Sequence, residues 1–424
     1  MAKSVSLPYG DGMQTVDIPE SNNLTIVTMP KSQIGKLEDE AEILEKALDE
    51  PINSLALTEL VNQQDRIVIV VNDHTRPGPT QLIVKAILRR LGIIGINDNQ
   101  ISFVVATGSH RLSTEAEISE IIGREVAERF KTECHNCLDD KSLVYYGTTK
   151  SGLPLYINRT VSEATFRITT GLIAPHHSAG FSGGRKSIVP GVAGLKTVSI
   201  HHSLPIRAYD PVIGIIEGNS FHDTALEAAK KVGVNFIVNA VQDSNKRNIA
   251  YVAGDLEAAH EVGVNICRKL CEVKINQLAD LVITSPGGYP RDTNLWQSQK
   301  ALSTAEMLVK PGGTIILVAE CRDGIGEGVF RDWLAEANSP DEVIERFRRE
   351  GFNVGSNKAF MVARALTKAR IIVVSHLLNP EDLQAMQLEG AQNLEEAYSK
   401  ANGKCTVQSI IVLPKAVTMI PVVK

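Results

Sequence analysis

Long apolar stretches are missing from this 424-residue sequence, and no run approaches the roughly 20 residues that a membrane helix needs. The six cysteines are scattered, and the close pair Cys134 and Cys137 has no second pair with which to complete a four-ligand zinc site. The N-terminus lacks the apolar core of a secretion signal. We therefore expect a soluble, cytoplasmic protein with reduced thiols and no membrane partner.

The sequence also lacks an excess of basic residues. Lysine and arginine number 44 against 49 aspartates and glutamates, which gives a net charge of −5, and the basic residues are dispersed. This pattern argues against a nucleic-acid partner and favours a small-molecule ligand.

The length of the chain favours two domains, because 424 residues exceed the usual size of one hydrophobic core. Short β-branched runs alternate with stretches of helical spacing, which predicts the α/β class, with a mainly parallel sheet flanked by helices in each domain. We place a cofactor-binding and catalytic domain at residues 1–274 and a substrate-clamping domain at 275–407. The strand at 408–424 is expected to return to the first domain. The first fifty residues predict a small β-hairpin and then an acidic, largely helical segment from Pro30 to Pro51.

The strands predicted in the first half are Arg66–Asn72, Ile101–Ala106, Phe166–Thr170 and Val234–Ala240, with helices at Gln81–Leu91 and Thr114–Phe130. Those predicted in the second half are Leu281–Ser285, Thr314–Ala319, Ile371–Ser375 and Ser409–Leu413, with helices at Asp292–Val309, Ser339–Glu350 and Ala359–Ala369.

Polar residues, histidine among them, follow three successive predicted strands. The segments are Asp73-His74-Thr75-Arg76-Pro77, Thr107-Gly108-Ser109-His110-Arg111 and the longer PHHSAGFSGGRK, from Pro175 to Lys186. His202 follows sixteen residues after Lys186, and His201 directly precedes it. Ligands of open α/β sheets bind outside the carboxyl ends of the strands, so we expect these segments to form one site.

Two nucleotide-binding motifs are incomplete. The glycine-rich segment supplies candidate phosphate contacts at Ser182, Gly183 and Gly184, but Arg185 breaks the Walker A spacing before Lys186 and Ser187. The segment Gly324–Gly328 lacks the spacing of a dinucleotide fingerprint. ATP hydrolysis and a Rossmann NAD site are therefore not predicted.

A further strand-end loop, GGYPRDTNLWQSQK from Gly287 to Lys300, runs into a predicted helix. Gln297 and Lys300 are three residues apart, so they share one helix face and can present an amide and a cation to a carboxylate.

Taken together, and in this order along the chain, the five segments resemble the nickel-pincer lactate racemase family. The resemblance implies that Lys186 is linked covalently to a pyridinium-3,5-bisthiocarboxylic acid mononucleotide, that His202 ligates its nickel, and that Asp73 braces the site. It also implies that cofactor-biosynthesis proteins load the chain, which we expect to act alone or as a homo-oligomer. A lysine amine is a suitable acyl acceptor, and imidazole is a common nickel ligand.

The resemblance further implies that His110 and His176 are paired acid/base groups, and that Arg76, Gln297 and Lys300 hold the substrate. Trp296 stands where a lactate enzyme is expected to have tyrosine, and His177 adds another polar candidate. The expected reaction inverts C2 of a 2-hydroxy acid, with lactate as the default and malate, gluconate or another longer 2-hydroxy acid as alternatives.

The chemistry fits these residues. The carboxylate already carries a negative charge, so loss of the C2 hydrogen as hydride, with a base taking the hydroxyl proton, is easier than loss of the C2 proton. Return of the hydride to the opposite face of the flat 2-keto acid gives the other enantiomer, which needs an acid/base group on each side. Side chains cannot accept hydride, so a cofactor is required. A divalent-metal hydrolase or lyase and a non-enzymatic cofactor carrier remain as alternatives.

Overall fold

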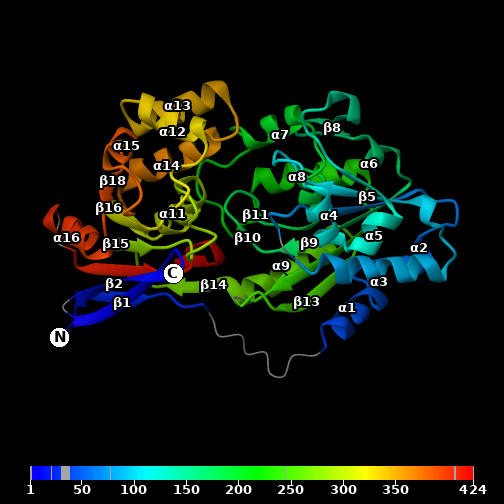
Figure 1. Ribbon diagram of the computed structural model, residues 1–424, viewed down its shortest axis with the longest axis horizontal. Helices are drawn as coiled ribbons and strands as arrows, with labels where there is room; N and C mark the ends of the chain where they lie inside the picture. The colour runs from blue at the N-terminus through cyan, green and yellow to red at the C-terminus, as the bar shows by residue number, and fades with distance from the viewer. Residues whose placement is uncertain are drawn as a thin grey trace.

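The computed structural model describes residues 2–20, 22–29, 39–76, 78–243, 245–404 and 407–423. Two lobes lie side by side, with the N-terminal hairpin beside the helices of the C-terminal half of the chain (Figure 1). Within the described ranges, no helix combines the length and apolar character needed to cross a membrane. The predicted α/β class is confirmed.

The first lobe is built on a six-stranded sheet with the order β13-β12-β9-β4-β5-β6. Only the pair β12 and β13 is antiparallel. The strands are β4 (Ile67–Asn72), β5 (Ile101–Ala106), β6 (Lys131–Cys134), β9 (Phe166–Ile173), β12 (Phe236–Gln242) and β13 (Asn248–Gly254).

Both faces of this sheet are covered, and β4, which reads IVIVVN, is buried along its first five residues. One face packs against α1 (Glu40–Asp49), α2 (Leu57–Leu60), α3 (Thr80–Ile93), α4 (Glu115–Ile122) and α5 (Arg124–Arg129). The other packs against α6 (Arg159–Glu163), α7 (Leu195–His202), α8 (Ser220–Val232), α9 (Ala258–Cys271) and the hairpin of β7 (Leu143–Thr148) and β8 (Pro154–Asn158). Parallel strands with two buried faces read as continuous apolar runs, which is why the sequence predicted them.

The second lobe has a six-stranded parallel sheet with the order β18-β17-β16-β15-β19-β3. Its strands are β3 (Asn23–Ile26), β15 (Ala279–Thr284), β16 (Val309–Val318), β17 (Arg370–Val374), β18 (Glu389–Ala391) and β19 (Ser409–Leu413). One face packs against α10 (Leu295–Ser298), α11 (Lys300–Glu306), α12 (Gly328–Glu336), α13 (Pro340–Glu350), α14 (Ser356–Lys368) and α15 (Pro380–Ala385). The other face packs against α16 (Leu394–Lys404) and the hairpin of β1 (Ala2–Tyr9) and β2 (Gly12–Pro19).

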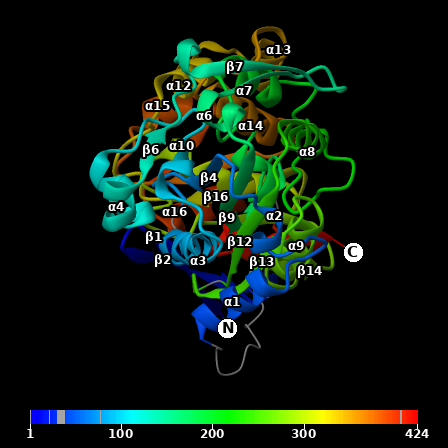
Figure 2. The same ribbon diagram turned by 90° about the vertical axis from the view of Figure 1, so that its right-hand side faces the viewer.

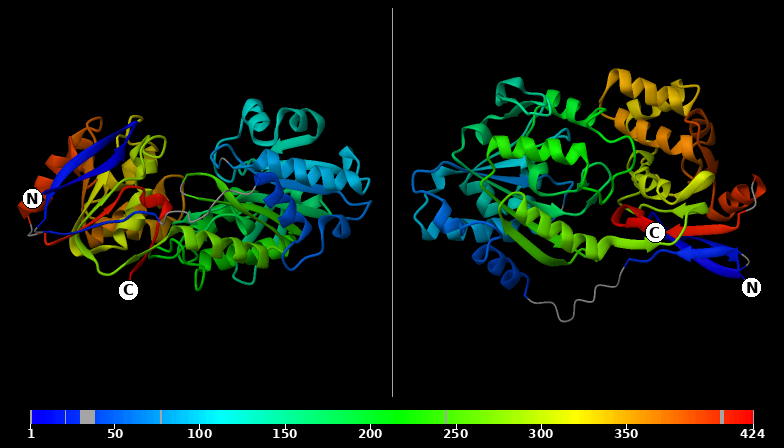
Figure 3. Two further views of the ribbon diagram at one scale, coloured as in Figure 1. Left: turned by 90° about the horizontal axis from the view of Figure 1, so that it is seen from below. Right: turned by 180° about the vertical axis from the view of Figure 1, so that it is seen from behind.

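Both ends of the chain contribute to the second sheet, because β19 lies between β15 and β3. The last strand, β20 (Ile420–Val423), pairs instead with β14 (Glu272–Ile275), and Ile420 packs into the core of the first lobe. Views from below and behind show these terminal segments beside the second lobe and near the junction (Figure 3). The predicted hairpin is confirmed, and α1 confirms part of the helical segment. Residues 30–38 and Pro77 lie outside the described ranges, and the boundary near residue 274 stays a prediction.

Candidate functional site

The carboxyl ends of β4, β5 and β9 lie at one edge of the first sheet, because the three strands are parallel neighbours. Figure 2 shows β4, β9 and β12 in succession across this sheet. Asp73 and Arg76 follow β4, and His110 follows β5. His176 lies in β10 (Pro175–His176), three residues after β9 ends. The structure thus brings the predicted strand-end segments to one edge of the sheet.

His110 is paired with a buried carboxylate. Its Nδ1 lies 2.7 Å from Oδ2 of Asp73, whose side chain is 2% exposed against 41% for His110. Burial on its own would raise the pKa of Asp73, but the hydrogen bond from His110 and the nearby positive charge lower that pKa below its usual value. The ionised Asp73 accepts the Nδ1 proton, which leaves Nε2 of His110 with a free lone pair.

His176 is paired with Lys186. Its Nε2 lies 2.9 Å from the Lys186 Nζ, and its Nδ1 accepts hydrogen bonds from the backbone N–H groups of Ser178 and Ala179 at 3.2 and 3.1 Å. A neutral imidazole carries one proton, so with Nδ1 accepting, the proton is on Nε2 and points at the lysine. Lys186 must then accept this hydrogen bond, which only an uncharged amine can do.

The surroundings of this pair favour the uncharged forms. Burial lowers the pKa of Lys186 well below its usual range, and the positive charge of Arg76 lowers it further. Burial likewise lowers the pKa of His176 well below its usual value, with Lys186 as the next cause. The ring of His177 stacks on that of His176, with the centroids 4.5 Å apart.

Two glycines hold the loop that carries Lys186 close to the sheet. Gly183 has φ 79°, and a Cβ there would lie 2.8 Å from a side-chain carbon of Ile173. Gly184 has φ 51°, and its N–H donates to Oδ1 of Asn239 on β12 at 2.9 Å. The Ser182 hydroxyl donates to the Leu172 carbonyl at 2.7 Å. These contacts fix the loop, and the roles of Ser182, Gly183 and Gly184 toward a cofactor stay predictions.

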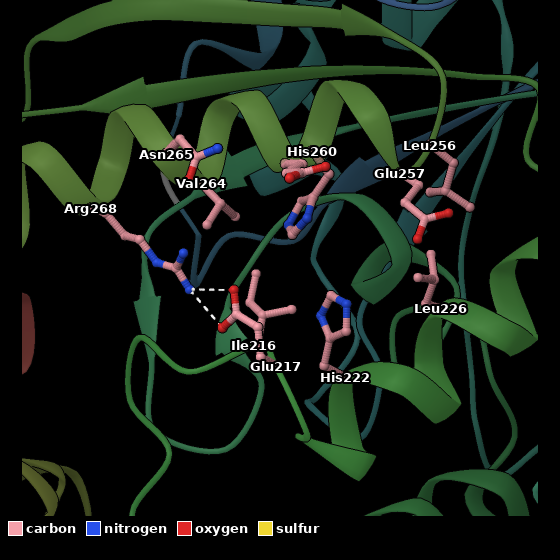
Figure 4. A pocket seen from close by; sticks show the side chains of 11 residues that line it. Ile216, Glu217, His222, Leu226, Leu256, Glu257, His260, Val264, Asn265 and Arg268 are labelled. Carbon is pink, nitrogen blue, oxygen red and sulfur yellow. Dashed lines mark hydrogen bonds and ion pairs between the residues drawn. The ribbon is translucent and has the colours of Figure 1, made fainter.

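Behind the same loop, the fully buried Arg185 donates to the carbonyls of Ala179 and Phe181 at 2.7 and 2.9 Å, and its Nη1 lies 2.8 Å from Nε2 of His260. A cavity of about 140 Å³ opens beside this support, lined in part by His222 and His260 (Figure 4). None of the site residues predicted from the sequence lines that cavity. The cavity therefore flanks the support of the loop and is separate from the His176 cluster.

His202, at the end of α7, has one ring nitrogen available. Its Nδ1 lies 3.0 Å from the Val198 carbonyl and donates to it, so Nε2 carries a lone pair. Burial lowers the pKa of His202 well below its usual value, which keeps the ring neutral as metal ligation requires. The neighbouring His201 has a structural role, because its Nε2 forms a hydrogen bond of 2.9 Å with the Phe221 carbonyl. Across the described ranges, no three His, Cys, Asp or Glu side chains gather into a group that could hold a metal ion.

The second lobe contributes Gln297 and Lys300. The predicted helix is interrupted here, since α10 ends at Ser298 and α11 begins at Lys300, yet the Lys300 ammonium still donates to the Gln297 Oε1. Burial lowers the pKa of Lys300 to about 8, and Arg76 is the next cause. The indole Nε1 of Trp296 is buried and has no hydrogen-bond partner among the described residues.

Two cations at the junction of the lobes were not identified from the sequence. Lys358, in the first turn of α14, is 7% exposed, and Arg207, after α7, is 3% exposed. Burial lowers the pKa of Lys358 well below its usual value, followed by the charges of Lys300 and Arg207. The sequence around each residue contains no pattern that predicts a functional role for it.

This arrangement gathers histidines and basic side chains of both α/β lobes around the carboxyl ends of the first sheet. Models of the lactate racemase N-terminal and C-terminal domains match residues 9–214 and 274–421. The lactate racemase of Lactiplantibacillus plantarum is 37% identical over 94% of each chain, and that of Thermoanaerobacterium thermosaccharolyticum is 33% identical over 98% of this chain and 99% of its own.

Solved structures of similar proteins agree with these sequence matches. The lactate racemase apoprotein from Thermoanaerobacterium thermosaccharolyticum superposes with a TM-score of 0.91 at 32% identity, covering 99% of this chain and all of that one. A crystal structure of a Thermotoga maritima protein, at 19% identity with a TM-score of 0.67, shares the fold. The chain belongs to the lactate racemase family, as its segments predicted, and it is an isomerase.

Proposed function

We propose that this protein interconverts the enantiomers of a 2-hydroxy acid, with lactate as the default substrate, through a nickel-pincer nucleotide attached to Lys186. The observation that carries this proposal is the pair of His176 and Lys186. A lysine that accepts a hydrogen bond from Nε2 of His176 is an uncharged amine, and once that hydrogen bond opens, its lone pair can attack an acyl carbon without first losing a proton.

The residues present fit this group. His202 offers Nε2 to a metal while its Nδ1 is held by Val198, and one protein nitrogen suits a metal whose other donor atoms belong to the nucleotide. A Cβ at Gly183 would lie 2.8 Å from Ile173 and one at Gly184 would lie 2.9 Å from His260, so the two glycines let the loop that carries Lys186 pack closely against β9 and α9. When bound, the nucleotide supplies what side chains lack, a centre that accepts hydride from C2 of the substrate and returns it.

We assign the acid/base roles to the two histidines, His110 and His176. His110 presents an unprotonated Nε2, so it is arranged to take the hydroxyl proton of the substrate, and ionised Asp73 stabilises the imidazolium that forms. His176 presents a protonated Nε2, so it is arranged to donate to the substrate oxygen. Inversion in both directions requires the two histidines to exchange these states between turnovers.

The carboxylate of the substrate is assigned to Arg76 and Lys300. Lys300 is positively charged below about pH 8, where its pKa lies, and Gln297 orients its ammonium. Charge-assisted hydrogen bonds of this kind are roughly twice as strong as neutral ones. They would fix C2 and its hydroxyl between the histidines.

The experiment is to produce the protein with and without the proteins that make and load the cofactor, and to follow conversion of L-lactate to D-lactate by chiral chromatography. Racemisation is expected only for the loaded protein. A hydrolase or lyase with a simple metal ion would instead need added metal alone, and a non-enzymatic carrier would load without turnover. Either result would replace this proposal.

We also propose that loading involves direct contact with cofactor-biosynthesis proteins, because the Lys186 amine is only partly accessible and needs a delivered, activated acyl group. Such loading fits a cytoplasmic protein, alone or as a homo-oligomer. Co-purification of the tagged chain with the loading proteins would support the contact, and loading by free activated nucleotide at an equal rate would argue against it.

A further inference from the structure

The guanidinium of Arg185 connects the two parts of the chain that carry His176 and Lys186. Its Nη2 donates to the carbonyl oxygens of Ala179 and Phe181 at 2.7 and 2.9 Å. Ala179 donates its own N–H to Nδ1 of His176 at 3.1 Å. Arg185 directly precedes Lys186 in the sequence, so one residue is linked both to the histidine and to the lysine that it contacts.

The second carbonyl that Arg185 binds belongs to the small hairpin of His176. Phe181 is the last residue of β11 (Gly180–Phe181), which pairs antiparallel with β10. His176 is the last residue of β10. The guanidinium therefore holds β11 and, through it, the strand that carries His176.

Lys186 is coupled to Arg185 because both lie in one tight turn. The turn is a 3₁₀ helix, η3 (Gly184–Ser187). Within it, the Lys186 N–H donates to the Gly183 carbonyl at 3.2 Å. A shift of Arg185 would therefore move the Lys186 backbone, and with it the 2.9 Å contact between the Lys186 Nζ and Nε2 of His176.

His260, on the neighbouring helix α9, holds this arrangement in place. Its Nε2 lies 2.8 Å from Nη1 of Arg185 and 2.9 Å from the Ser182 carbonyl oxygen. A Cβ on Gly184 would lie 2.9 Å from Cδ2 of the ring, so the loop packs directly against the imidazole. All of α9 is described, and no other side chain of this helix is hydrogen-bonded to residues 182–186.

A neutral imidazole holds the loop in either of its tautomers. Arginine can only donate and a carbonyl can only accept, so Nε2 satisfies Arg185 in one tautomer and Ser182 in the other. Burial lowers the pKa of His260 well below its usual value, and the charge of Arg185 lowers it further. Arg185 is itself fully buried and forms no ion pair with a described residue, so its charge depends on these hydrogen bonds. Without the imidazole, we expect the guanidinium to shift toward water and to take the loop with it.

We propose that His260 and Arg185 are positioning residues, which set the contact between Lys186 and His176 and so hold the lysine amine in place for attachment of the cofactor. The role of that amine rests on the proposed function, whereas the geometry of the contact does not. His260 lines the cavity shown in Figure 4 together with His222. The His222 side chain makes no hydrogen bond to a described residue, so it offers a matched control in the same cavity.

The first test measures the Lys186 amine in the cofactor-free protein, by competitive labelling with a trace of acetic anhydride across a pH series and peptide mass spectrometry. In the wild type, Lys186 should become reactive at a lower pH than the exposed Lys196, because burial and the charge of Arg76 lower its pKa. His260→Leu fills the same space without a hydrogen bond, so water should reach the amine and raise the midpoint of labelling by about one pH unit.

Two further variants separate positioning from general loosening of the fold. His260→Gln keeps a donor and an acceptor for Ser182 and Arg185, and it should keep the wild-type midpoint. His222→Leu should also keep it. An unchanged midpoint in His260→Leu would overturn the proposal, and so would an equal rise in His222→Leu. Should His260→Leu fail to fold by circular dichroism, His260→Asn replaces it, because its shorter amide cannot reach Arg185.

The second test is the rate at which the cofactor adduct forms, followed by intact mass with the loading proteins present. His260→Leu is expected to load on the order of 10- to 100-fold more slowly, as misplacement of a reacting group predicts, whereas His260→Gln and His222→Leu should load at the wild-type rate. Loading of His260→Leu at the wild-type rate would contradict the proposal. Failure of the proposed function would look different, because the wild type would then acquire no adduct while the labelling result would stand.

Discussion

The Nζ of Lys186 lies 2.9 Å from Nε2 of His176, and the other nitrogen of that ring accepts two backbone N–H groups. The backbone thereby fixes the tautomer of His176, and the tautomer fixes the charge of Lys186. His110 and His202 are also held through Nδ1, by Asp73 and by the Val198 carbonyl. His110 and His202 thus have no partner at Nε2 among the described residues, whereas Nε2 of His176 is directed at Lys186.

Substitution of Lys186 by alanine should abolish covalent loading, because the amine that is held uncharged beside His176 is lost. Intact mass of protein made with the loading proteins is the measurement. Lys196→Ala is the control, since this lysine on α7 is exposed and its ammonium donates to the Tyr156 hydroxyl at 3.3 Å, away from His176. A full adduct on the Lys186 variant would mean that another residue carries the cofactor.

Replacement of His202 by alanine should separate the two attachments. Nickel content, measured by atomic emission, should fall at least tenfold, whereas the organic adduct on Lys186 should remain, because a coordination bond and a covalent link are independent. His201→Ala is expected to lower the melting temperature instead, since its Nε2 holds the Phe221 carbonyl. Unchanged nickel and turnover in His202→Ala would remove it from the ligand role.

His110→Ala and His176→Ala should each keep the adduct and slow racemisation by roughly 10²–10⁴-fold, as is typical for a general acid/base. At equilibrium a racemase cannot become one-way, so both directions must slow together. Half-reactions can differ, however, and an acid-quenched single turnover should release 2-keto acid from opposite enantiomers in the two variants. Equal release from both enantiomers in both variants would show that the two-sided assignment is wrong.

The pH dependence of substrate use should follow Lys300. Burial lowers its pKa to about 8, so the ammonium is charged below that pH and neutral above it. The kcat/KM of the loaded protein should therefore fall as the pH rises through about 8. Lys300→Arg should move this fall above pH 9, because arginine keeps its charge. Arg76→Gln and Lys300→Gln should each reduce kcat/KM by about tenfold or more, and values within twofold of the wild type would contradict their assignment.

The sequence predicted the buried strands well, because a parallel strand covered on both faces is a short continuous apolar run. β5 and β19 have the predicted bounds. The helix predicted at Thr114–Phe130 is two helices, since Gly123 between α4 and α5 has φ 92°, which helical spacing does not reveal. Likewise α10 and α11 divide the predicted Asp292–Val309.

The histidine and lysine segments could be identified because each follows an apolar run, where ligands of α/β sheets bind. Lys358 and Arg207 could not be. Tertiary packing buries each of them without a hydrogen-bond or ion-pair partner among the described residues, and a single sequence has no signal for such burial.

The central claim is that C2 is inverted by hydride transfer through a centre that keeps the hydrogen, and not by exchange of a C2 proton with water. The most direct measurement is racemisation of C2-deuterated lactate in ordinary water, with the product enantiomer analysed by mass spectrometry. The account predicts that the inverted product keeps its deuterium and that the reaction shows a primary isotope effect. Replacement of the deuterium by solvent hydrogen at the rate of inversion would contradict it.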